Sequence, residues 1–166
     1  MKYLDYLDVT SESLSQIKNG AFLTVQEHDN VNVMTIGWAS IGFMWGRPMM
    51  TVMVRNSRYT FELIEKSTEF TVSVPKTDMR SALNICGTKS GRDIDKLKEC
   101  AIELFPGEKV KTPVLNIPGI HFECAIIYKS ALNPQNLVEE YTHLYPEKDY
   151  HTNYYGEIRT CYSTVD

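Results

Sequence analysis

The sequence predicts a mainly β domain, namely a β-barrel decorated with a few small helices. Short stretches rich in β-branched and aromatic residues recur along the chain, and Gly, Pro, Asn and Asp separate them. No repeated strand–helix–strand unit is visible, and both standard phosphate loops, G-x-G-x-x-G and G-x-x-x-x-G-K-[ST], are absent. A closed set of antiparallel strands fits this pattern better than a doubly wound nucleotide-binding fold.

Length and composition predict one globular domain over residues 1–166. The chain has a mass of 19.0 kDa, 43% hydrophobic and 23% charged residues, which is ordinary for a folded domain with its own core. The formal net charge is −4 and the pI is near 5.6, so no nucleic-acid partner is expected. Any positively charged binding site must therefore be confined to a small part of the surface.

Cysteine and histidine spacing predicts neither a disulfide framework nor a metal site. The four cysteines are far apart and form no C-x-x-C pair, so we expect free thiols, as in a reducing compartment. The four histidines stand at no recognised metal spacing. The N-terminus is acidic where a signal peptide would be apolar, and no stretch is long enough to span a bilayer, so we expect a cytoplasmic protein without a membrane segment.

Up to residue 74 the pattern predicts two helices and four strands. The expected elements are a helix that Thr10 or Ser11 caps and Asn19-Gly20 ends, strands over 21–26, 31–40 and 49–54, a helix over 61–66 that Ser57 caps, and a strand over 69–74. The first two strands form an antiparallel hairpin. Because 31–40 and 49–54 are long apolar runs, we expect both to be covered on both faces.

The second half predicts two further helices and two long strands. The expected elements are a helix that Asp78 caps and Gly87 ends, a donor-rich turn over 87–93, a short helix over 94–100, extended pieces over 105–119, a strand over 120–132, a polar and partly helical excursion over 136–145, and a final strand over 150–162. The strand over 120–132 alternates apolar and polar residues, as a half-buried strand does.

The junction after the strand over 49–54 is the first candidate binding site. The segment Arg55-Asn56-Ser57-Arg58-Tyr59-Thr60 leads into a helix, whose start carries unpaired N–H groups and the positive end of the helix dipole. Two arginines and two hydroxyls there suit a phosphate group. The alternative is an ordinary surface helix with solvated arginines, and a basic helix start alone favours that alternative.

The glycine-flanked turn with Lys89, Ser90 and Arg92 is the second candidate. If both basic loops converge, one phosphate would receive charge-assisted hydrogen bonds from each, and the strand over 34–38 would lie beside the group that the phosphate carries. The alternative is two unrelated loops, with Arg92 paired to Asp93 or Asp95. The residues alone leave these two alternatives open.

Two further groups of residues could take part in chemistry, but a structural role explains each of them better. His121 and Glu123 lie two residues apart on one strand face, as many structural pairs do. Cys86 stands at a helix end before a basic turn, where a thiol pKa can be lowered, but we expect a plain thiol. No Ser-His-Asp or Cys-His signature is present.

The sequence also resembles the flavin reductase-like family of FMN-binding split barrels, which includes the flavoredoxins. The matching segments are 20–24 (GAFLT), 32–38 (NVMTIGW), 46–48 (GRP), 55–60 (RNSRYT), 69–75 (EFTVSVP), 86–96 (CGTKSGRDIDK), 122–124 (FEC), 149–152 (DYHT) and 155–158 (YGEI). They cover nearly the whole chain. The combination of C-G-x-x-S-G-R-D-x-D-K with N-x-M-T-x-G-W is specific, although each piece alone is weak.

This resemblance implies a homodimeric, six-stranded Greek-key split barrel that holds one FMN per subunit near the dimer interface. The exposed pair Met44-Trp45 is a candidate for that interface. The positions that match the family's flavin contacts are Asn32, Met34, Thr35, Ile36 and Trp38 beside the ring and ribityl chain, Arg55, Ser57, Arg58, Tyr59 and Thr60 around the phosphate, and Lys89 and Ser90 from the second loop. His151 matches a histidine near the nicotinamide pocket of flavin reductases, but its neighbours Asp149-Tyr150 and Tyr154-Tyr155 depart from the commonest form.

The function that the resemblance implies is an FMN-dependent oxidoreductase. Electrons would pass from NAD(P)H or another donor through the bound FMN to free flavin or to a redox partner. The cofactor would carry the chemistry, in keeping with the absence of a catalytic dyad. The alternatives are a flavoredoxin-type electron carrier without a nicotinamide site, and a split-barrel binding protein that has lost its flavin.

Overall fold

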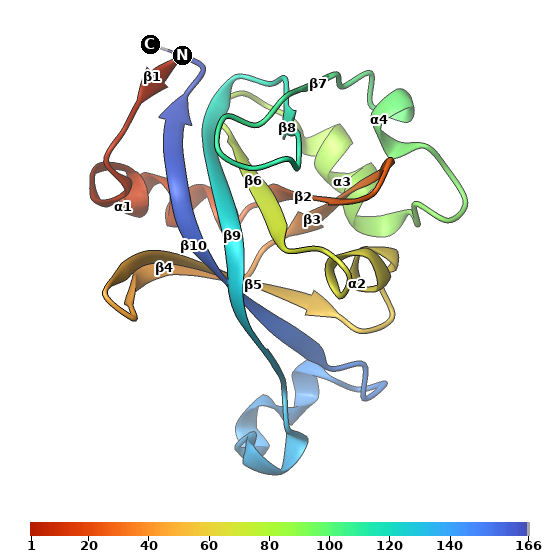
Figure 1. The fold of residues 1–166 in the computed structure, drawn as a ribbon. Helices are drawn as coiled ribbons and strands as arrows, with labels where there is room; N and C mark the ends of the chain where they lie inside the picture. Colours follow the sequence, from red (N-terminus) through yellow and green to blue (C-terminus); the bar gives the residue numbers. More distant parts are fainter. Residues whose placement is uncertain (166) are drawn as a thin grey trace.

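The computed structural model describes residues 1–165, which form a mainly β domain with small helices, as predicted (Figure 1). The strands are β1 (Lys2–Tyr3), β2 (Ala21–Glu27), β3 (Asn30–Ile36), β4 (Ala39–Met44), β5 (Arg47–Arg55), β6 (Glu69–Pro75), β7 (Leu104–Phe105), β8 (Val114–Leu115), β9 (Gly119–Ala131) and β10 (His151–Ser163). The helices are α1 (Tyr6–Ile17), α2 (Tyr59–Ile64), α3 (Arg80–Thr88) and α4 (Lys96–Glu99), with 3-10 turns η1 (Pro134–Asn136) and η2 (Glu139–Leu144).

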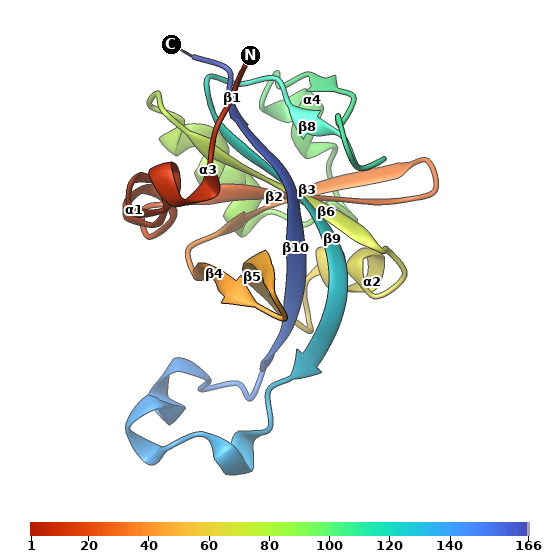
Figure 2. The same ribbon diagram turned by 60° about the vertical axis from the view of Figure 1, so that its left-hand side comes forward.

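One antiparallel sheet carries the domain. Its strands follow the order β3-β2-β6-β9-β10-β5-β4, and β1 pairs with the far end of β10, which makes eight strands in the sheet. The resemblance implied six barrel strands, two fewer than this sheet contains. Figures 1 and 2 show the sheet strongly curved, with α3 beside β2 and β3. The helix α2 contributes Leu63 and Ile64 to the main core.

The long β9–β10 hairpin joins two wings of the sheet. β6 pairs with the first half of β9, over Gly119–Ala125, whereas β5 pairs with the first half of β10, over His151–Glu157. Because the two strands are antiparallel, these halves lie at opposite ends of the hairpin, and the wings are split apart. A bulge beside Gly156 bends β10 at the crossover, where a Cβ on Gly156 would lie 2.6 Å from Phe70 Cε1.

The main core fills the inside of the curved sheet. Its largest members include Phe70, Phe122 and Tyr154, each with 0% of its surface exposed. Burial of an apolar side chain of this size contributes roughly 1.5–3 kcal/mol. A second cluster, around Phe22 and Val33, packs the outer face of β2 and β3 against α3. The strand β3 is therefore covered on both faces, as predicted, and it stands between the core and α3.

The first helix begins more than one turn earlier than predicted. Asp5 is its N-terminal cap, and its carboxylate accepts the N–H of Leu7 at 2.9 Å. The predicted cap Thr10 lies inside the helix, where its hydroxyl donates to Tyr6 O at 2.7 Å, and Ser11 is also internal. The prediction was wrong because a second acceptable cap stands earlier in the chain and lengthens the helix.

Two further predictions on local structure were wrong. The strand predicted over 31–40 is two strands, because the chain leaves β3 after Ile36 and begins β4 at Ala39. The helix α2 has no side-chain cap, and the hydroxyl of the predicted cap Ser57 is bonded elsewhere. In both cases the local structure is determined by contacts with residues distant in the sequence: β4 pairs with β5, and the Ser57 hydroxyl donates to Asp149.

The segment over 133–150 projects from the barrel between β9 and β10, as Figures 1 and 2 show. It contains η1 and η2, and most of its residues are exposed. Tyr145, with 6% exposure, is its buried side chain and fixes it to the barrel. This is the polar excursion that the sequence predicts.

All four cysteines are free thiols, as predicted, and three of them are buried. Among residues 1–165, no helix is both long and apolar enough to cross a membrane.

Candidate functional site

The two basic loops predicted as anion sites converge on one cavity of about 230 Å³. Its wall is formed by Met34, Arg55, Ser57, Arg58, Tyr59, Thr60, Thr88, Lys89, Ser90, Arg92, Lys96 and Asp149. Eight of the twelve positions predicted from the resemblance, and the second-loop residue Arg92, are among them. The alternative of two unrelated loops is thereby excluded, because Ser57 and Lys89 line the same space. Below, this space is called the anion cavity.

The first loop, over 55–60, is fixed by the end of β5 and the start of α2. Arg58 N donates to Arg55 O at 3.0 Å and closes a tight turn. Thr152 at the start of β10 donates its hydroxyl to Asn56 Oδ1 at 2.9 Å. From β3, Asn32 Nδ2 donates to the Thr60 hydroxyl at 2.8 Å. The loop is therefore tied to both wings of the sheet.

The second loop begins where α3 ends and packs directly on the first. Arg58 Nη1 donates to Gly87 O at 2.9 Å, and the Arg92 guanidinium lies 5.2 Å from the ring centre of Tyr59. Arg92 is paired with Glu62, and not with Asp93 or Asp95 as the alternative of two unrelated loops had it. Both Arg58 and Arg92 therefore hold the two loops together as well as lining the cavity.

Glycine at position 91 permits this close approach. A Cβ there would overlap Asn32 Oδ1 and lie 2.9 Å from Tyr59 Cδ1. The second loop can approach β3 and α2 only because no side chain intervenes.

An internal carboxylate already occupies part of the anion cavity. Ser57 donates its N–H to Asp149 Oδ1 at 3.1 Å and its hydroxyl to Asp149 Oδ2 at 2.6 Å. These are the same donors that the sequence assigns to an anion. The cavity therefore binds a negatively charged group in this structure, which supports the chemistry predicted for it. In the sequence, Asp149 stands out only as an unusual neighbour of His151.

Arg55 connects the anion cavity to the projecting segment. Its Nη1 donates to Asp149 O at 2.7 Å, its Nη2 donates to Leu144 O at 3.1 Å, and its guanidinium lies 5.0 Å from the centre of the Tyr145 ring. The guanidinium thus uses at least two of its five N–H groups to donate hydrogen bonds to backbone carbonyls. Arg55 positions the segment over 133–150 beside the cavity.

Lys96 is a cavity residue that the sequence analysis missed. Its side chain is 6% exposed, and Nζ donates to Val33 O at 2.9 Å and to Cys86 O at 3.0 Å. Burial lowers the pKa of this ammonium, and the charge of Arg58 acts in the same direction. A lysine in a short polar helix is typical of an exposed face, so its burial was not visible in the local pattern.

The residues predicted beside the ring are placed in three different environments. Met34 lines the anion cavity, and Asn32 supports it from behind. Thr35 instead donates its hydroxyl to Leu83 O at 2.6 Å, facing α3, and Ile36 belongs to the main core. The side chains of β3 alternate between two faces, so Thr35 lies on the face toward α3. Ile36 shares the face of Met34 but lies further along the strand, in the main core.

Trp38 borders a second hollow of about 550 Å³, together with Thr51, Met53 and Asn153. Trp38 has 42% of its surface exposed. Thr51, Met53 and Arg55 alternate along β5 and share one face, so this face leads from the hollow to the anion cavity over roughly 13 Å. Thr51, Met53 and Asn153 were missed, although the alternation of Thr51 and Met53 with Arg55 along β5 was a usable signal.

His151 lies between the hollow and the anion cavity. Its ring centre is 5.2 Å from that of Trp38, and its Nδ1 is 2.8 Å from the Tyr145 hydroxyl. Burial lowers the pKa of His151 to about 4, and the positive charge of Arg55 acts in the same direction. The imidazole is therefore neutral at pH 7, with Nδ1 positioned to accept a hydrogen bond from the Tyr145 hydroxyl.

The other candidate residues have structural roles. Burial raises the pKa of Cys86 to about 12, which makes it a plain thiol, as expected. His121 and Glu123 do not contact each other through a hydrogen bond. Glu123, at 0% exposure, accepts the N–H groups of residues 108–110 and the hydroxyl of Tyr162. Among residues 1–165, no group of three or more His, Cys, Asp or Glu is arranged to hold a metal ion.

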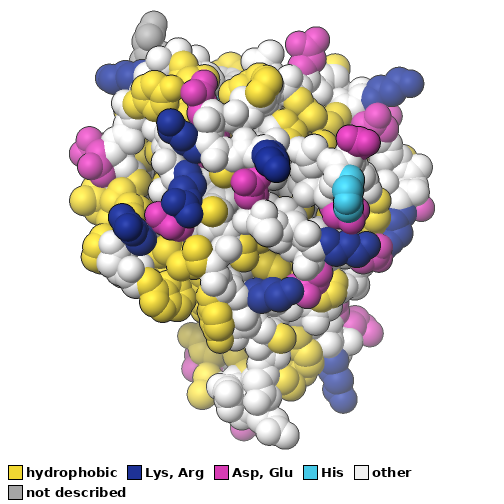
Figure 3. Space-filling model, in the orientation of Figure 1, with side chains coloured by type: hydrophobic (Ala, Val, Ile, Leu, Met, Phe, Trp, Pro, Cys, Tyr) yellow, Lys and Arg dark blue, Asp and Glu magenta, His cyan; other side chains and the backbone are white. Residues whose placement is uncertain are grey.

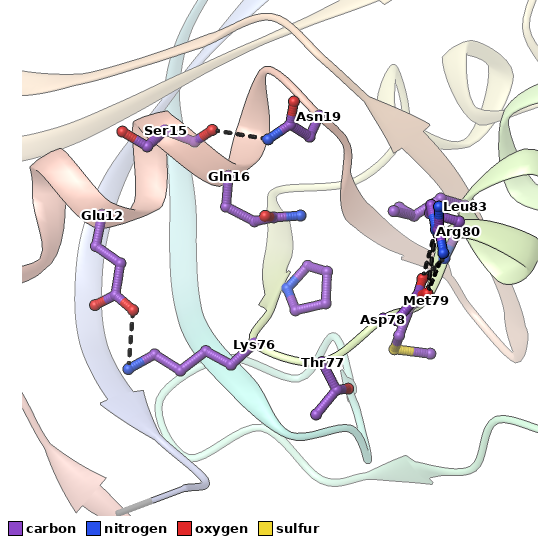
Figure 4. A pocket seen from close by; sticks show the side chains of 11 residues that line it. Glu12, Ser15, Gln16, Asn19, Lys76, Thr77, Asp78, Met79, Arg80 and Leu83 are labelled. Atoms are coloured by element: carbon purple, nitrogen blue, oxygen red, sulfur yellow. Dashed lines mark hydrogen bonds and ion pairs between the residues drawn. The ribbon is translucent and has the colours of Figure 1, made fainter.

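A larger open groove of about 930 Å³ lies away from this chemistry, between α1 and the start of α3. Figure 4 shows that its charged side chains are already paired within the groove. Glu12 binds Lys76 at 3.1 Å, and Arg80 binds Asp78 at 2.6 Å. The anion cavity is smaller, but its converging basic groups and N–H donors make it the better candidate site.

Comparison with known proteins agrees with the fold. The flavin reductase like domain family matches residues 17–162. An uncharacterized protein of Pyrococcus abyssi is 36% identical over 106 residues, which cover 63% of this chain and 60% of that protein. The chain thus matches less than two thirds of the length of this relative.

Solved structures of the same fold include two flavoredoxins. Flavoredoxin from Methanosarcina acetivorans is 28% identical, with a TM-score of 0.67 over 87% of this chain and 67% of that one. Flavoredoxin of Desulfovibrio vulgaris (Miyazaki F) is 23% identical, with a TM-score of 0.68 over 87% of this chain and 68% of that one, and shows likeness of fold alone. Since the family match spans most of the residues that build the barrel and the anion cavity, the chain belongs to the flavin reductase like domain family.

Proposed function

We propose that this protein binds FMN, with the phosphate in the anion cavity. One observation supports the proposal. The two basic loops line the same cavity, and Ser57 of the first loop already donates two hydrogen bonds to the Asp149 carboxylate there. Arg58, Lys89, Ser57 and Ser90 would hold the phosphate, through charge and through hydrogen bonds. The donor set fits a phosphate group because it combines cations, hydroxyls and a backbone N–H at one point.

The ring of the flavin would lie along the apolar face between the two hollows. Met34 borders the anion cavity, and Met53 and Trp38 border the second hollow. The distance of roughly 13 Å along β5 suits a ribityl chain between a phosphate and a ring. These side chains would exclude water from one face of the ring and fix its orientation. The flavin itself would supply the redox chemistry when bound.

As an activity we propose an NAD(P)H-dependent flavin reductase type of oxidoreductase, which passes electrons to free flavin or to a redox partner. Family membership supports an oxidoreductase. The exposed Trp38 ring, which lies 5.2 Å from the neutral His151 imidazole, borders an open hollow that would admit a second flat ring. The likeness to the Methanosarcina flavoredoxin favours a second candidate, an electron carrier without a nicotinamide site.

The first experiment is a visible spectrum of the purified protein, followed by titration with FMN. Retention of FMN by the wild type, and its loss in a variant carrying both Arg58→Ala and Lys89→Ala, is the expected result. A matched control is Arg47→Ala, because Arg47 is exposed at the other end of β5. Protein that stays colourless and binds no added FMN would overturn the proposal, and would favour a barrel that acts only in binding another partner.

Anaerobic mixing with NADH and with NADPH separates the two redox candidates. Prompt bleaching of the flavin band by either nucleotide is expected for the reductase. An unchanged spectrum with both nucleotides, followed by bleaching with dithionite, would identify the carrier instead. His151→Asn offers a further probe, because it should slow bleaching by nucleotide more than bleaching by dithionite.

We also propose a homodimer that forms through the surface of β4 and the end of β9. Phe43 is 65% exposed, Trp45 61% and Tyr128 52%. The rings of Trp45 and Tyr128 are 5.9 Å apart and both contact Tyr155, so the aromatic surface is continuous. Hydrophobic side chains gather around the position of β4 in Figure 3, whereas basic and acidic side chains are mixed over the rest of that face. A second copy of this surface would cover it.

Sedimentation of the wild type and of a Trp45→Glu variant tests the dimer. The expected result is a dimer that the variant converts to monomer while its circular dichroism is unchanged. Glu139→Lys, in the exposed η2 turn, is a control that should leave the mass unchanged. A monomeric wild type at high concentration would refute the proposal.

A further inference from the structure

Lys96 is a buried cation without a carboxylate partner. Only 6% of its surface is exposed, and among residues 1–165 no acidic oxygen lies within 4.0 Å of its Nζ. Nζ instead donates to Val33 O at 2.9 Å and to Cys86 O at 3.0 Å. An ammonium has three N–H donors, so these two carbonyls leave one without a bonded atom in the described part of the chain.

A buried charge of this kind is costly. The penalty for removing an ion from water amounts to several kcal/mol unless an opposite charge offsets it. Two carbonyl dipoles offset only part of it, and the nearby Arg58 adds to the excess of positive charge. The neighbouring acidic residue Asp95 uses its carboxylate to cap α4, where it accepts the N–H of Lys98 at 3.1 Å. The protein alone therefore leaves the charge of Lys96 without a counter-ion.

The position of Lys96 identifies where a counter-ion would enter. Its side chain is part of the wall of the anion cavity. The two carbonyls that it binds belong to β3, directly before Met34, and to the last turn of α3, directly before the second loop. Lys96 thus joins the two elements that carry the ring side and the phosphate side of the site.

We infer that Lys96 is the buried cationic partner of the ligand's phosphate, and that it makes the cavity selective for a phosphorylated flavin over an unphosphorylated one. The inference rests on the proposed function. A dianionic phosphate in the anion cavity supplies the missing counter-charge, and the third N–H of Lys96 is the donor still free to face it. Lys96 is accordingly a positioning and specificity residue, and no proton transfer is assigned to it.

The test compares two ligands that differ by the phosphate alone. FMN and riboflavin are titrated into purified wild type and Lys96→Met, whose side chain keeps the length and the apolar stem. Charge-assisted hydrogen bonds are worth about 1.5–3 kcal/mol, so we expect Lys96→Met to weaken FMN binding by about 10- to 100-fold and riboflavin binding by less than about threefold. Lys98→Met is the matched control, because Lys98 is exposed on the same short helix.

Equal weakening of both ligands in Lys96→Met would overturn the inference, because it would assign Lys96 a structural role only. So would unchanged FMN affinity. The proposed function fails in a different way, namely by a wild type that binds neither FMN nor riboflavin. The FMN-to-riboflavin affinity ratio therefore separates the two conclusions.

A measurement on the wild type serves if Lys96→Met does not fold. The Lys96 side chain is titrated by NMR with riboflavin bound and then with FMN bound. The titratable or charged groups that face it are Arg58, before α2, Cys86 in α3 and Cys100 after α4, and all three are the same in both complexes. We expect a higher pKa for Lys96 with FMN. An identical pKa with both ligands would overturn the inference.

Discussion

Ser57 and Asp149, 92 residues apart in the chain, form the contact that joins the anion cavity to the projecting segment. The Asp149 carboxylate accepts the Ser57 hydroxyl at 2.6 Å and its backbone N–H at 3.1 Å. A carboxylate and a phosphate would compete for these donors and would repel each other. Binding of a phosphorylated ligand is therefore coupled to displacement of Asp149, and so to the position of the segment over 133–150.

Asp149→Asn should strengthen the binding of phosphorylated ligands. The amide keeps an oxygen that can accept from Ser57, but it carries no charge to oppose the phosphate. We expect FMN affinity to rise by about tenfold, the equivalent of 1.4 kcal/mol, and riboflavin affinity to stay within about twofold. Isothermal titration measures both, with Glu147→Gln, an exposed neighbour in the same segment, as control. Weaker FMN binding would show that Asp149 assists the phosphate instead.

Arg55→Met should release the segment over 133–150 from the barrel. The variant keeps an apolar stem against Tyr145 but loses the hydrogen bonds to the carbonyls of Leu144 and Asp149. We expect faster amide hydrogen exchange over 133–150, with little change in β6 and β9. Arg47→Met, at the opposite end of the same strand, should leave the exchange unchanged. If the segment stays protected in Arg55→Met, the Tyr145–His151 contact alone fixes it.

Glu123→Gln should destabilise the fold without touching the anion cavity. The Glu123 carboxylate accepts the N–H groups of Glu108, Lys109 and Val110, at 2.9, 2.6 and 3.2 Å. A glutamine would turn an NH₂ group toward at least one of these donors and leave it unpaired. We expect the free energy of unfolding in urea to fall by about 2–3 kcal/mol, and FMN affinity to be retained. Glu139→Gln is the exposed control, and equal stability of the two variants would contradict the prediction.

Much of the sheet could be predicted because alternation along a strand is a local signal. The predicted strand over 120–132 is observed at 119–131, and the one over 150–162 at 151–163. The break between β3 and β4 was missed, because Gly37 and Trp38 lie in an apolar run whose propensities continue unchanged. What separates the two strands is pairing, since β3 bonds to β2 whereas β4 bonds to β5.

The anion cavity could be predicted in part, since its basic residues stand in two recognisable loops. Their convergence depends on Arg58 reaching Gly87 O and on the missing side chain at Gly91, which are tertiary contacts. Asp149 and Lys96 escaped prediction for a related reason. A carboxylate in a polar loop and a lysine in a short helix are usually solvated, and only the fold brings them to the cavity.

Two buried histidines should make stability fall as the pH is lowered. Burial lowers the pKa of His121 to about 4, and burial and Arg55 lower the pKa of His151 to about 4. In the unfolded chain both titrate near 6.5, so below this pH the unfolded state takes up protons that the folded state does not. The two histidines therefore leave the free energy of unfolding unchanged above pH 6.5, and they lower it progressively as the pH falls from 6.5 toward 4. Between pH 7.5 and 5.0, each histidine should cost about 2 kcal/mol.

His121→Asn isolates one of these contributions. The asparagine amide can replace the hydrogen bond of His121 Nδ1 to Ser73, and it does not titrate. Urea unfolding at pH 7.5 and 5.0 should therefore show a smaller loss of stability in the variant than in the wild type, by about 2 kcal/mol. Carboxylates contribute equally to both proteins and cancel in the comparison. His28→Asn, whose side chain is 88% exposed, should keep the wild-type difference. An unaltered difference in His121→Asn would mean that His121 is protonated inside the fold, with Ser73 and Thr164 accepting its hydrogens.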